Sequence, residues 1–246
     1  MKLPRHYVEK PWGRTELPRQ FDAPPGKRIG EVWFDGGADL PLLAKYIFTS
    51  ERLSIQVHPN DEQARARGLK QGKSECWYIV EAQPDAVLGL GLRRQASQDE
   101  LRMAALDGGI EELMDWRPVR AADFVFVEAG TIHAIGAGIS LLEFQQNSDV
   151  TYRLYDYGRP RELHLDDGLK VATPSPFTDA IKHPTENQTL VDGPHFTLEM
   201  ATEDKLLDRQ RWIMPLDGDN AGDCLLLEPG EHFESDGARL LIGASS

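Results

Sequence analysis

The sequence is poor in cysteine, in positive charge and in long apolar runs. Only two cysteines occur among 246 residues, Cys76 and Cys224, and each lies within an apolar stretch. We therefore expect buried free thiols rather than a disulfide framework. The first residues contain no apolar signal core, and no apolar run approaches the length that spans a membrane. These features predict a protein of the reducing cytoplasm with no membrane partner.

The excess of acidic over basic side chains limits the kinds of partner. Asp and Glu number 40 and Lys and Arg number 27, which gives a formal net charge of −13 at pH 7. Such a charge disfavours nucleic acid and anionic membrane surfaces, because both attract basic proteins. An anionic small molecule would have to be bound by a local group of cationic side chains that acts against the global field.

Strand-like segments outnumber helical ones and recur at short spacing, separated by turns rich in glycine. The predicted strands cover 31–34, 42–49, 53–58, 76–80, 86–90, 124–127, 140–145, 151–155, 197–200, 211–215, 224–227 and 239–242. Many short strands of this kind favour a β-sandwich or a jelly roll.

Helical signals are few. Asn60 caps a short helix that Gly68 closes, and Ser97 with Glu100 forms a capping box before an apolar-periodic segment that reaches 106. A third short helix is predicted over 166–171. The sequence thus predicts an all-β fold with few short helices.

Four polar side chains lie at or near the ends of predicted strands. Residues two apart in a strand point to the same face, so Gln56 and His58 project side by side. Glu75 opens one apolar run, and His133 follows another across a glycine turn. A single histidine on a strand is more often packed or solvated than a ligand. The combination favours a site for one divalent metal without thiolates, which suits Zn²⁺ and also Mn²⁺, Co²⁺ or Fe²⁺.

The segment from Asp123 to His133 resembles the second half of the cupin motif, with Glu128-Ala129-Gly130 where cupins often show Pro-x-Gly. The first half departs from the usual pattern, because Gln56 stands where cupins have a histidine. The expected fold is a cupin-type jelly roll plus a smaller C-terminal β-unit. The predicted limits are 1–165 for the metal-binding cupin domain, 166–187 for a proline-rich linker with a short helix, and 188–246 for the C-terminal unit.

Four longer segments carry the most specific signal in the chain. They cover 53–61 (LSIQVHPND), 72–78 (GKSECWY), 130–135 (GTIHAI) and 147–157 (NSDVTYRLYDY), and shorter signatures lie at 10–14 and 29–33. In this order they resemble type I mannose-6-phosphate isomerase, also called phosphomannose isomerase. The chain lacks the helical insertion of longer members and so resembles the short bacterial form. The resemblance extends from about Lys10 to Tyr157 and is weak after Phe177.

The resemblance implies a zinc-dependent enzyme that interconverts mannose 6-phosphate and fructose 6-phosphate through an enediol, with one Zn²⁺ per chain. The implied zinc ligands are Gln56, His58, Glu75 and His133. The implied catalytic or substrate-binding residues are Lys73 and Arg153, with Ser54 and Arg159 on the phosphate. We expect a sugar phosphate as the small-molecule partner, and a monomer or small homo-oligomer.

The chemistry of three of these side chains can also be argued from the residues themselves. Lys73 shares a face with Glu75 if the strand extends back that far, and a nearby dication would lower its pKa; the alternative is a surface lysine. Arg153 and Arg159 carry planar guanidinium groups that suit a phosphate or a developing oxyanion. The alternative for both is an ion pair with Asp149 or Asp156.

Glu143 is a carboxylate inside an apolar predicted strand. Burial there would raise its pKa and make it a candidate catalytic acid or base. The alternative is a partner that orients a metal-bound histidine.

Two other functions remain open at this level. The short C-terminal region is compatible with a non-catalytic sugar-phosphate sensor. A metal-dependent cupin oxygenase is a weaker alternative, because such enzymes usually present an all-His or His/Glu site and Gln56 replaces a histidine here.

Overall fold

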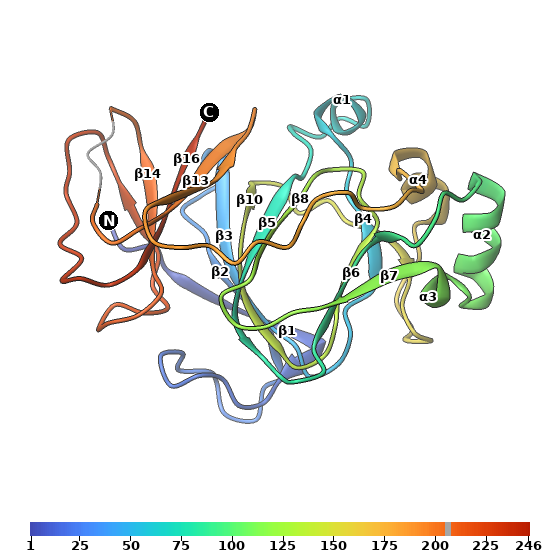
Figure 1. The fold of residues 1–246 in the computed structure, drawn as a ribbon, viewed down its shortest axis with the longest axis horizontal. Coiled ribbons are helices and arrows are strands. Elements are labelled where there is room, and N and C mark those ends of the chain that lie inside the picture. The colour runs from blue at the N-terminus through green and yellow to red at the C-terminus, as the bar shows by residue number, and fades with distance from the viewer. Residues whose placement is uncertain (205–207) are drawn as a thin grey trace.

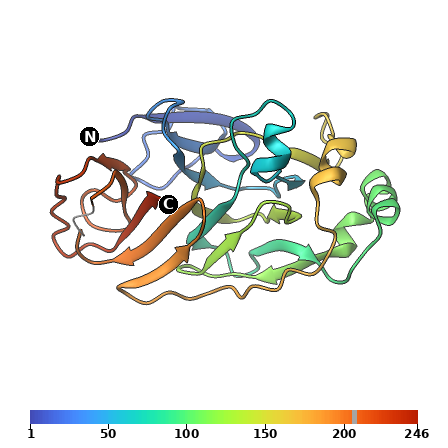
Figure 2. The ribbon, with the colours of Figure 1, turned by 90° about the horizontal axis from the view of Figure 1, so that it is seen from above.

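The structure, a computed structural model, describes residues 1–204 and 208–246. Its strands form three antiparallel sheets arranged as layers (Figures 1 and 2). The central sheet has the order β1 (Arg5–Arg14), β2 (Ile29–Phe34), β3 (Leu42–Phe48), β10 (Ile139–Gln146), β5 (Glu75–Ala82), β8 (Phe124–Val127). The outer sheet has the order β11 (Tyr152–Tyr155), β4 (Ile55–Val57), β9 (His133–Ile135), β6 (Val87–Leu92), β7 (Met114–Pro118). The C-terminal sheet has the order β12 (Gln188–Asp192), β13 (Phe196–Ala201), β16 (Leu240–Ser245), β14 (Arg211–Pro215), β15 (Leu225–Leu227).

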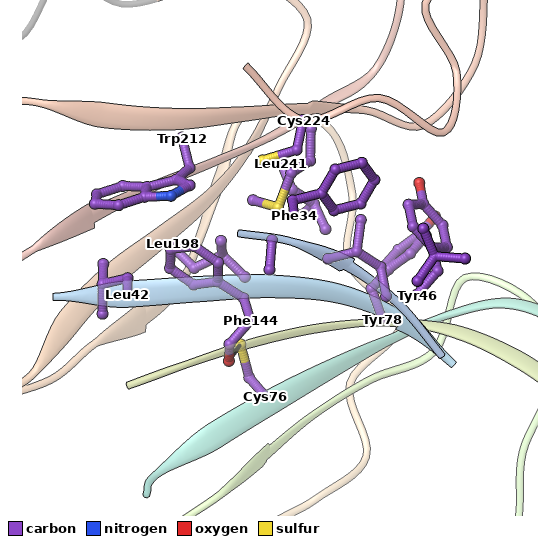
Figure 3. Packing of buried hydrophobic residues seen from close by; sticks show 14 of the residues in the cluster. Phe34, Leu42, Tyr46, Cys76, Tyr78, Phe144, Leu198, Trp212, Cys224 and Leu241 are labelled. Atoms are coloured by element: carbon purple, nitrogen blue, oxygen red, sulfur yellow. Dashed lines mark hydrogen bonds between the residues drawn. The ribbon is translucent and has the colours of Figure 1, made fainter. Parts of the chain in front are cut away.

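The central and outer sheets enclose the jelly-roll core, and the C-terminal sheet covers the other face of the central sheet. Side chains on the two faces of β10 belong to different cores: Leu141 packs in the jelly roll, whereas Phe144 packs with Trp212 of the C-terminal sheet (Figure 3). Because both faces are covered, every residue of β3 and β10 is buried. The polar members of these strands, among them Lys45 and Glu143, are therefore buried too, and the three sheets confirm the predicted all-β fold.

The helices are short and lie outside the three layers (Figure 1). They are α1 (Asp61–Arg65), α2 (Gln98–Asp107), α3 (Ile110–Leu113) and α4 (Leu165–Val171). Asn60 and Gln63 form a reciprocal capping box on α1, and the Ser97 side chain accepts from the backbone N–H of Glu100 on α2. Among the described residues, no helix is long and apolar enough to cross a membrane.

Every predicted strand and helix overlaps an observed one, but several observed elements were not predicted. These are β1, β7, β9, β12 and α3. The strand β1 contains Pro11, carries charged residues and has irregular pairing with β2, so its sequence lacks a clean alternation. The strand β9 has only three residues and lies between the glycines at 130 and 136, so it is not part of a longer apolar run.

The segment 172–187 follows α4 and runs along the jelly roll to the C-terminal sheet (Figure 2). The Thr173 N–H donates to the Gly130 carbonyl at 2.8 Å, and Lys182 and Phe124 exchange two backbone bonds at 2.8 Å. The C-terminal sheet begins at Gln188 and shares a hydrophobic cluster with the central sheet. The division of the chain into separate domains at 165 and 188 stays a prediction.

Candidate active site

Register across the outer sheet places three of the predicted site residues in one row. Arg153 pairs directly with Gln56, and Gln56 pairs directly with His133. Directly opposite residues in paired strands share a face of the sheet. Gln56 and Arg153 line a cavity between the two sheets of the jelly roll, so this row faces inward.

A second row crosses the central sheet and faces the first. Glu143 of β10 pairs directly with Lys45 of β3 on one side and with Trp77 of β5 on the other. The Trp77 Nε1–H donates to Glu143 Oε2 at 3.0 Å, and the Lys45 ammonium lies 3.5 Å from Glu143 Oε1. Lys45 also lies 4.2 Å from the centre of the Trp33 ring. The buried pair of Lys45 and Glu143 is thus held by its direct neighbours in the sheet.

Three buried side chains, one of them His133 of the first row, form a group that can hold a metal ion. The ligand atoms of His58, Glu75 and His133 all lie within 4.8 Å of one another. His58 Nε2 lies 3.5 Å from Glu75 Oε2, and His133 Nε2 lies 3.3 Å from Glu75 Oε1. The structure therefore brings together three of the four predicted ligands.

Backbone carbonyls fix the orientation of both imidazoles. His58 Nδ1 lies 2.8 Å from the Val150 carbonyl oxygen, and His133 Nδ1 lies 2.9 Å from that of Thr131. Because a carbonyl only accepts, each Nδ1 must carry the proton, which leaves the Nε2 lone pair directed toward Glu75. This is the arrangement in which histidine binds a metal through Nε2.

The electrostatics of the group also fit a cation. Burial, together with the charge of Lys73, lowers the pKa of His58 to about 3, and burial lowers that of His133. Burial alone would raise the pKa of Glu75, but the positive charge of Lys73 and contacts with the histidines hold it well below its usual value. Glu75 Oε1 is buried without a hydrogen-bond donor and faces the lone pair of His133 Nε2. Two acceptors so placed fit a metal ion between them.

Gln56 lies beside this group, but its amide nitrogen is the nearer atom. Gln56 Nε2 lies 3.2 Å from His133 Nε2, and its Oε1 accepts from the Ser54 hydroxyl at 3.1 Å. To bind a metal through oxygen, the amide has to turn over. Its role as the fourth ligand stays a prediction.

Lys73 is buried and contacts the same group. Its ammonium contacts Glu75 Oε2, lies 3.2 Å from His58 Nε2 and lies 3.8 Å from Glu143 Oε1. The surface-lysine alternative is therefore wrong. Burial alone would lower the pKa of Lys73, but the carboxylates of Glu143 and Glu75 raise it. The sequence-based prediction was a lowered pKa of Lys73 with a divalent metal ion bound nearby. That statement stays a prediction.

Glu143 is buried, and its pKa is raised by burial and by the charge of Glu75, as predicted for a carboxyl in an apolar strand. Its contacts are with Trp77, Lys45 and Lys73. Trp77 in turn meets the His133 ring edge-on, with centroids 5.4 Å apart. Glu143 therefore does not contact His133 directly, and the Trp77 indole connects the two side chains.

The cavity has a volume of about 210 Å³ and lies between the two rows. Its lining includes five of the predicted residues: Ser54, Gln56, Lys73, Glu143 and Arg153. It also includes charged residues outside the predicted set of site residues: Lys10, Glu31, Lys45, Asp149 and Arg161. A charge inside an apolar predicted strand is the signal that would have found Glu31 and Lys45, because such a charge needs a buried partner.

The three arginines of the 153–161 segment lie in different surroundings. The Arg153 guanidinium donates to the Glu162 carbonyl at 2.6 Å. Arg159 binds Asp156 at 2.8 Å, as in the ion-pair alternative, and does not line the cavity. Arg161 also binds Asp156, at 2.6 Å, and does line it.

Comparison with known proteins gives one consistent family. No family model matches the chain. A mannose-6-phosphate isomerase of Bacillus subtilis is 45% identical over 142 residues, which are 55% of this chain and 45% of that protein. One from Streptococcus mutans is 40% identical over 169 residues, which are 64% of this chain and 53% of that protein. The chain thus spans about half the length of the curated relatives it matches.

Solved structures extend the likeness over the whole chain. The crystal structure of mannose 6-phosphate isomerase from Bacillus subtilis superposes with a TM-score of 0.73 at 27% identity, over 99% of this chain and 96% of that one. A variant of phosphomannose isomerase from Salmonella typhimurium shares the fold, with a TM-score of 0.63 at 13% identity over 100% of this chain and 96% of that one. The chain is therefore similar in sequence and in fold to mannose-6-phosphate isomerases, the family that its motifs resemble.

Proposed function

We propose that the protein is a zinc-dependent aldose–ketose isomerase that interconverts mannose 6-phosphate and fructose 6-phosphate through an enediol. The names of its relatives support this activity. The observation that carries the proposal is the contact of the buried His58–Glu75–His133 group with Lys73, which lines a cavity of the jelly roll together with Glu143. Buried ion pairs are often no more stabilising than apolar side chains of the same size, so stability alone does not account for this group of buried charges.

The proposed zinc ligands are Gln56, His58, Glu75 and His133. Two neutral imidazoles, an amide and one carboxylate leave the site with a net charge of roughly +1 when Zn²⁺ is bound. The ion supplies a positive charge that stabilises negative charge on a substrate oxygen.

The reaction moves a proton from C2 to C1 of the sugar and a hydrogen between O1 and O2. Glu143 is suited to carry such a proton, because its pKa is raised and it lines the cavity. Lys73 is the other candidate, as a donor to an oxygen. Arg153, which pairs with Gln56 in the outer sheet, is the proposed group that stabilises negative charge on the enediol. Ser54 and Arg159 are the proposed phosphate ligands.

A coupled assay for fructose 6-phosphate tests the proposal. Purified protein should convert mannose 6-phosphate, lose activity after dialysis against a chelator, and regain it with Zn²⁺. Binding of mannose 6-phosphate without turnover would favour the sensor. Consumption of oxygen in the same preparation would favour the oxygenase.

Metal content of variants tests the ligand assignment independently of turnover. His133→Ala or His58→Ala should bring zinc well below one per chain, whereas Gln56→Ala should have a smaller effect because an amide oxygen is the weakest of the four ligands. The matched control is His6→Ala, since His6 is exposed on β1. Full zinc occupancy in His133→Ala would refute the assignment.

A further inference from the structure

Lys73 lies in a part of the chain that no sheet holds in place. The strand β5 begins at Glu75, so Lys73 precedes the first ladder hydrogen bonds. The segment from β4 to β5 also contains α1 and leaves the jelly roll before it returns (Figure 1). A lysine on such a connection has many conformations available, yet Lys73 is only 4% exposed and contacts both His58 and Glu75. Some other contact must therefore fix its backbone.

Asp61 and Gln146 supply that contact from two different elements. Asp61 Oδ1, on α1, accepts from the Gly72 N–H at 2.8 Å and from Gln146 Nε2 at 2.9 Å. Gln146, at the end of β10, uses its other amide atom: Oε1 accepts from the Ser74 N–H at 2.9 Å. The Gln146 N–H also donates to the Ser74 carbonyl at 3.1 Å. The residues on both sides of Lys73 are thus tied to one linked pair.

The same segment is pressed against the residues that follow His58. The Lys73 N–H donates to the Pro59 carbonyl at 3.0 Å. A Cβ at Gly72 would lie 2.5 Å from the carbonyl carbon of Asn60, so only glycine permits this approach. The backbone at Lys73 is therefore held at a fixed distance from the end of β4.

We propose that Asp61 and Gln146 form a positioning pair that fixes Lys73 and Glu75 opposite His58. Neither residue lines the cavity, so neither touches substrate. The inference rests on the proposed isomerase for its catalytic consequence, because a displacement of about 1 Å in a catalytic group can lower the rate about 10²-fold. The hydrogen bonds themselves do not depend on that function.

Three substitutions separate the positioning role of Asp61 and Gln146 from an effect of the Asp61 charge and from a general loss of stability. Asp61→Ala removes the shared acceptor, whereas Asp61→Asn keeps an oxygen for Gly72 and Gln146 and removes only the charge. Gln146→Glu keeps the acceptor for Ser74 but sets a carboxylate against Asp61. The control is Glu62→Ala, which removes an exposed acid from the same helix.

Hydrogen exchange of the Gly72 and Ser74 amides, measured by NMR, gives a readout apart from activity. We expect exchange of Gly72 at least about 10-fold faster in Asp61→Ala, and of both amides in Gln146→Glu, with wild-type rates in Asp61→Asn and Glu62→Ala. In the coupled assay kcat should fall at least about 10-fold in the first two variants and less than about 2-fold in the others. Melting temperature and zinc content, measured alongside, identify a variant that fails to fold.

Different results overturn different statements. Unchanged exchange in Asp61→Ala and Gln146→Glu, or equal loss of kcat in Asp61→Asn and Asp61→Ala, would overturn the positioning pair. Failure of the wild-type protein to convert mannose 6-phosphate would overturn the proposed isomerase, and the exchange rates would still decide whether the pair holds the segment.

Discussion

Buried charges are the most telling feature at the scale of single residues. Lys45, Lys73 and Glu143 are each at most 4% exposed, and Glu75 is fully buried. A buried ion pair is often no more stable than apolar side chains of the same size. Charged residues held this closely within a sheet core are therefore better explained by chemistry than by stability.

The arginine beside Gln56 is expected to act on the reacting end of the sugar. Arg153 pairs directly with Gln56, and its guanidinium group is held by the Glu162 carbonyl rather than by a carboxylate. Arg153→Ala should lower kcat by about 10²-fold with little change in KM, the pattern of an interaction made in the transition state. The control is Arg102→Ala on exposed α2. Normal kcat with a raised KM would make Arg153 a phosphate ligand instead.

The phosphate group can be assigned by comparing two neighbouring arginines. Arg159 is the position that the motif implies, but Arg161 is the one that lines the cavity with Ser54. Both bind Asp156. If Arg159 holds the phosphate, Arg159→Ala should raise KM for mannose 6-phosphate far more than it lowers kcat, with Arg161→Ala much milder. The reverse order would place the phosphate at Arg161. Steady-state kinetics of both variants measure this directly.

At the scale of elements, local patterns predicted the strands and caps but not their neighbours. The run 42–49 and the capping residues Asn60 and Ser97 each carry their own signal, and each gave the observed element. Lys45 was missed as a site residue because its partner Glu143 lies far along the chain. They meet only because β10 lies between β3 and β5, an order that no single segment encodes.

The same limit applies to the site itself. His58 and His133 were predicted as ligands from strand ends and from the motif, and the structure places them together. The exclusion of Arg159 from the cavity was not predictable, because it depends on how the chain turns after β11 and on the position of Asp156.

One element of the C-terminal sheet is anchored by a buried ion pair. Arg211 opens β14, is fully buried, and binds Asp204 through two bonds of 2.9 and 2.7 Å. Asp204 also accepts from the Phe233 N–H at 2.8 Å. Asp204→Ala leaves the guanidinium without a counter-charge and should destabilise the protein by about 3–5 kcal/mol in urea unfolding. Asp99→Ala, at an exposed position of α2, should change stability by less than about 0.5 kcal/mol. Equal midpoints for the two variants would contradict the anchoring role.

At the scale of the whole molecule, the C-terminal sheet supports the strand that carries Glu143. Phe144, the next residue along β10, points the other way and packs edge-on against Trp212, with ring centroids 6.1 Å apart (Figure 3). It also packs edge-on against Phe196, with ring centroids 5.3 Å apart. The outer sheet packs on one face of β10 and the C-terminal sheet packs on the other, so both hold this strand in place. The C-terminal sheet stabilises the cavity without lining it.

Gly243 of β16 is the position where this packing is tightest. A Cβ there would lie 2.3 Å from the ring of Phe144, which is itself fully buried. Overpacking of this kind costs about 1–3 kcal/mol, so Gly243→Ala should lower the free energy of unfolding by that amount. Because the strain falls on β10, kcat should also fall, whereas the far-UV circular dichroism spectrum should stay that of the wild-type fold. Gly193→Ala is the matched control, since the nearest atoms to its Cβ would lie at 3.5 Å.

The double variant Gly243→Ala, Phe144→Leu makes room for the new methyl group and should lose less stability than the two single changes summed. Additive losses in the double variant would show that the two side chains do not compete for the same space, and that the C-terminal sheet supports the cavity by another contact.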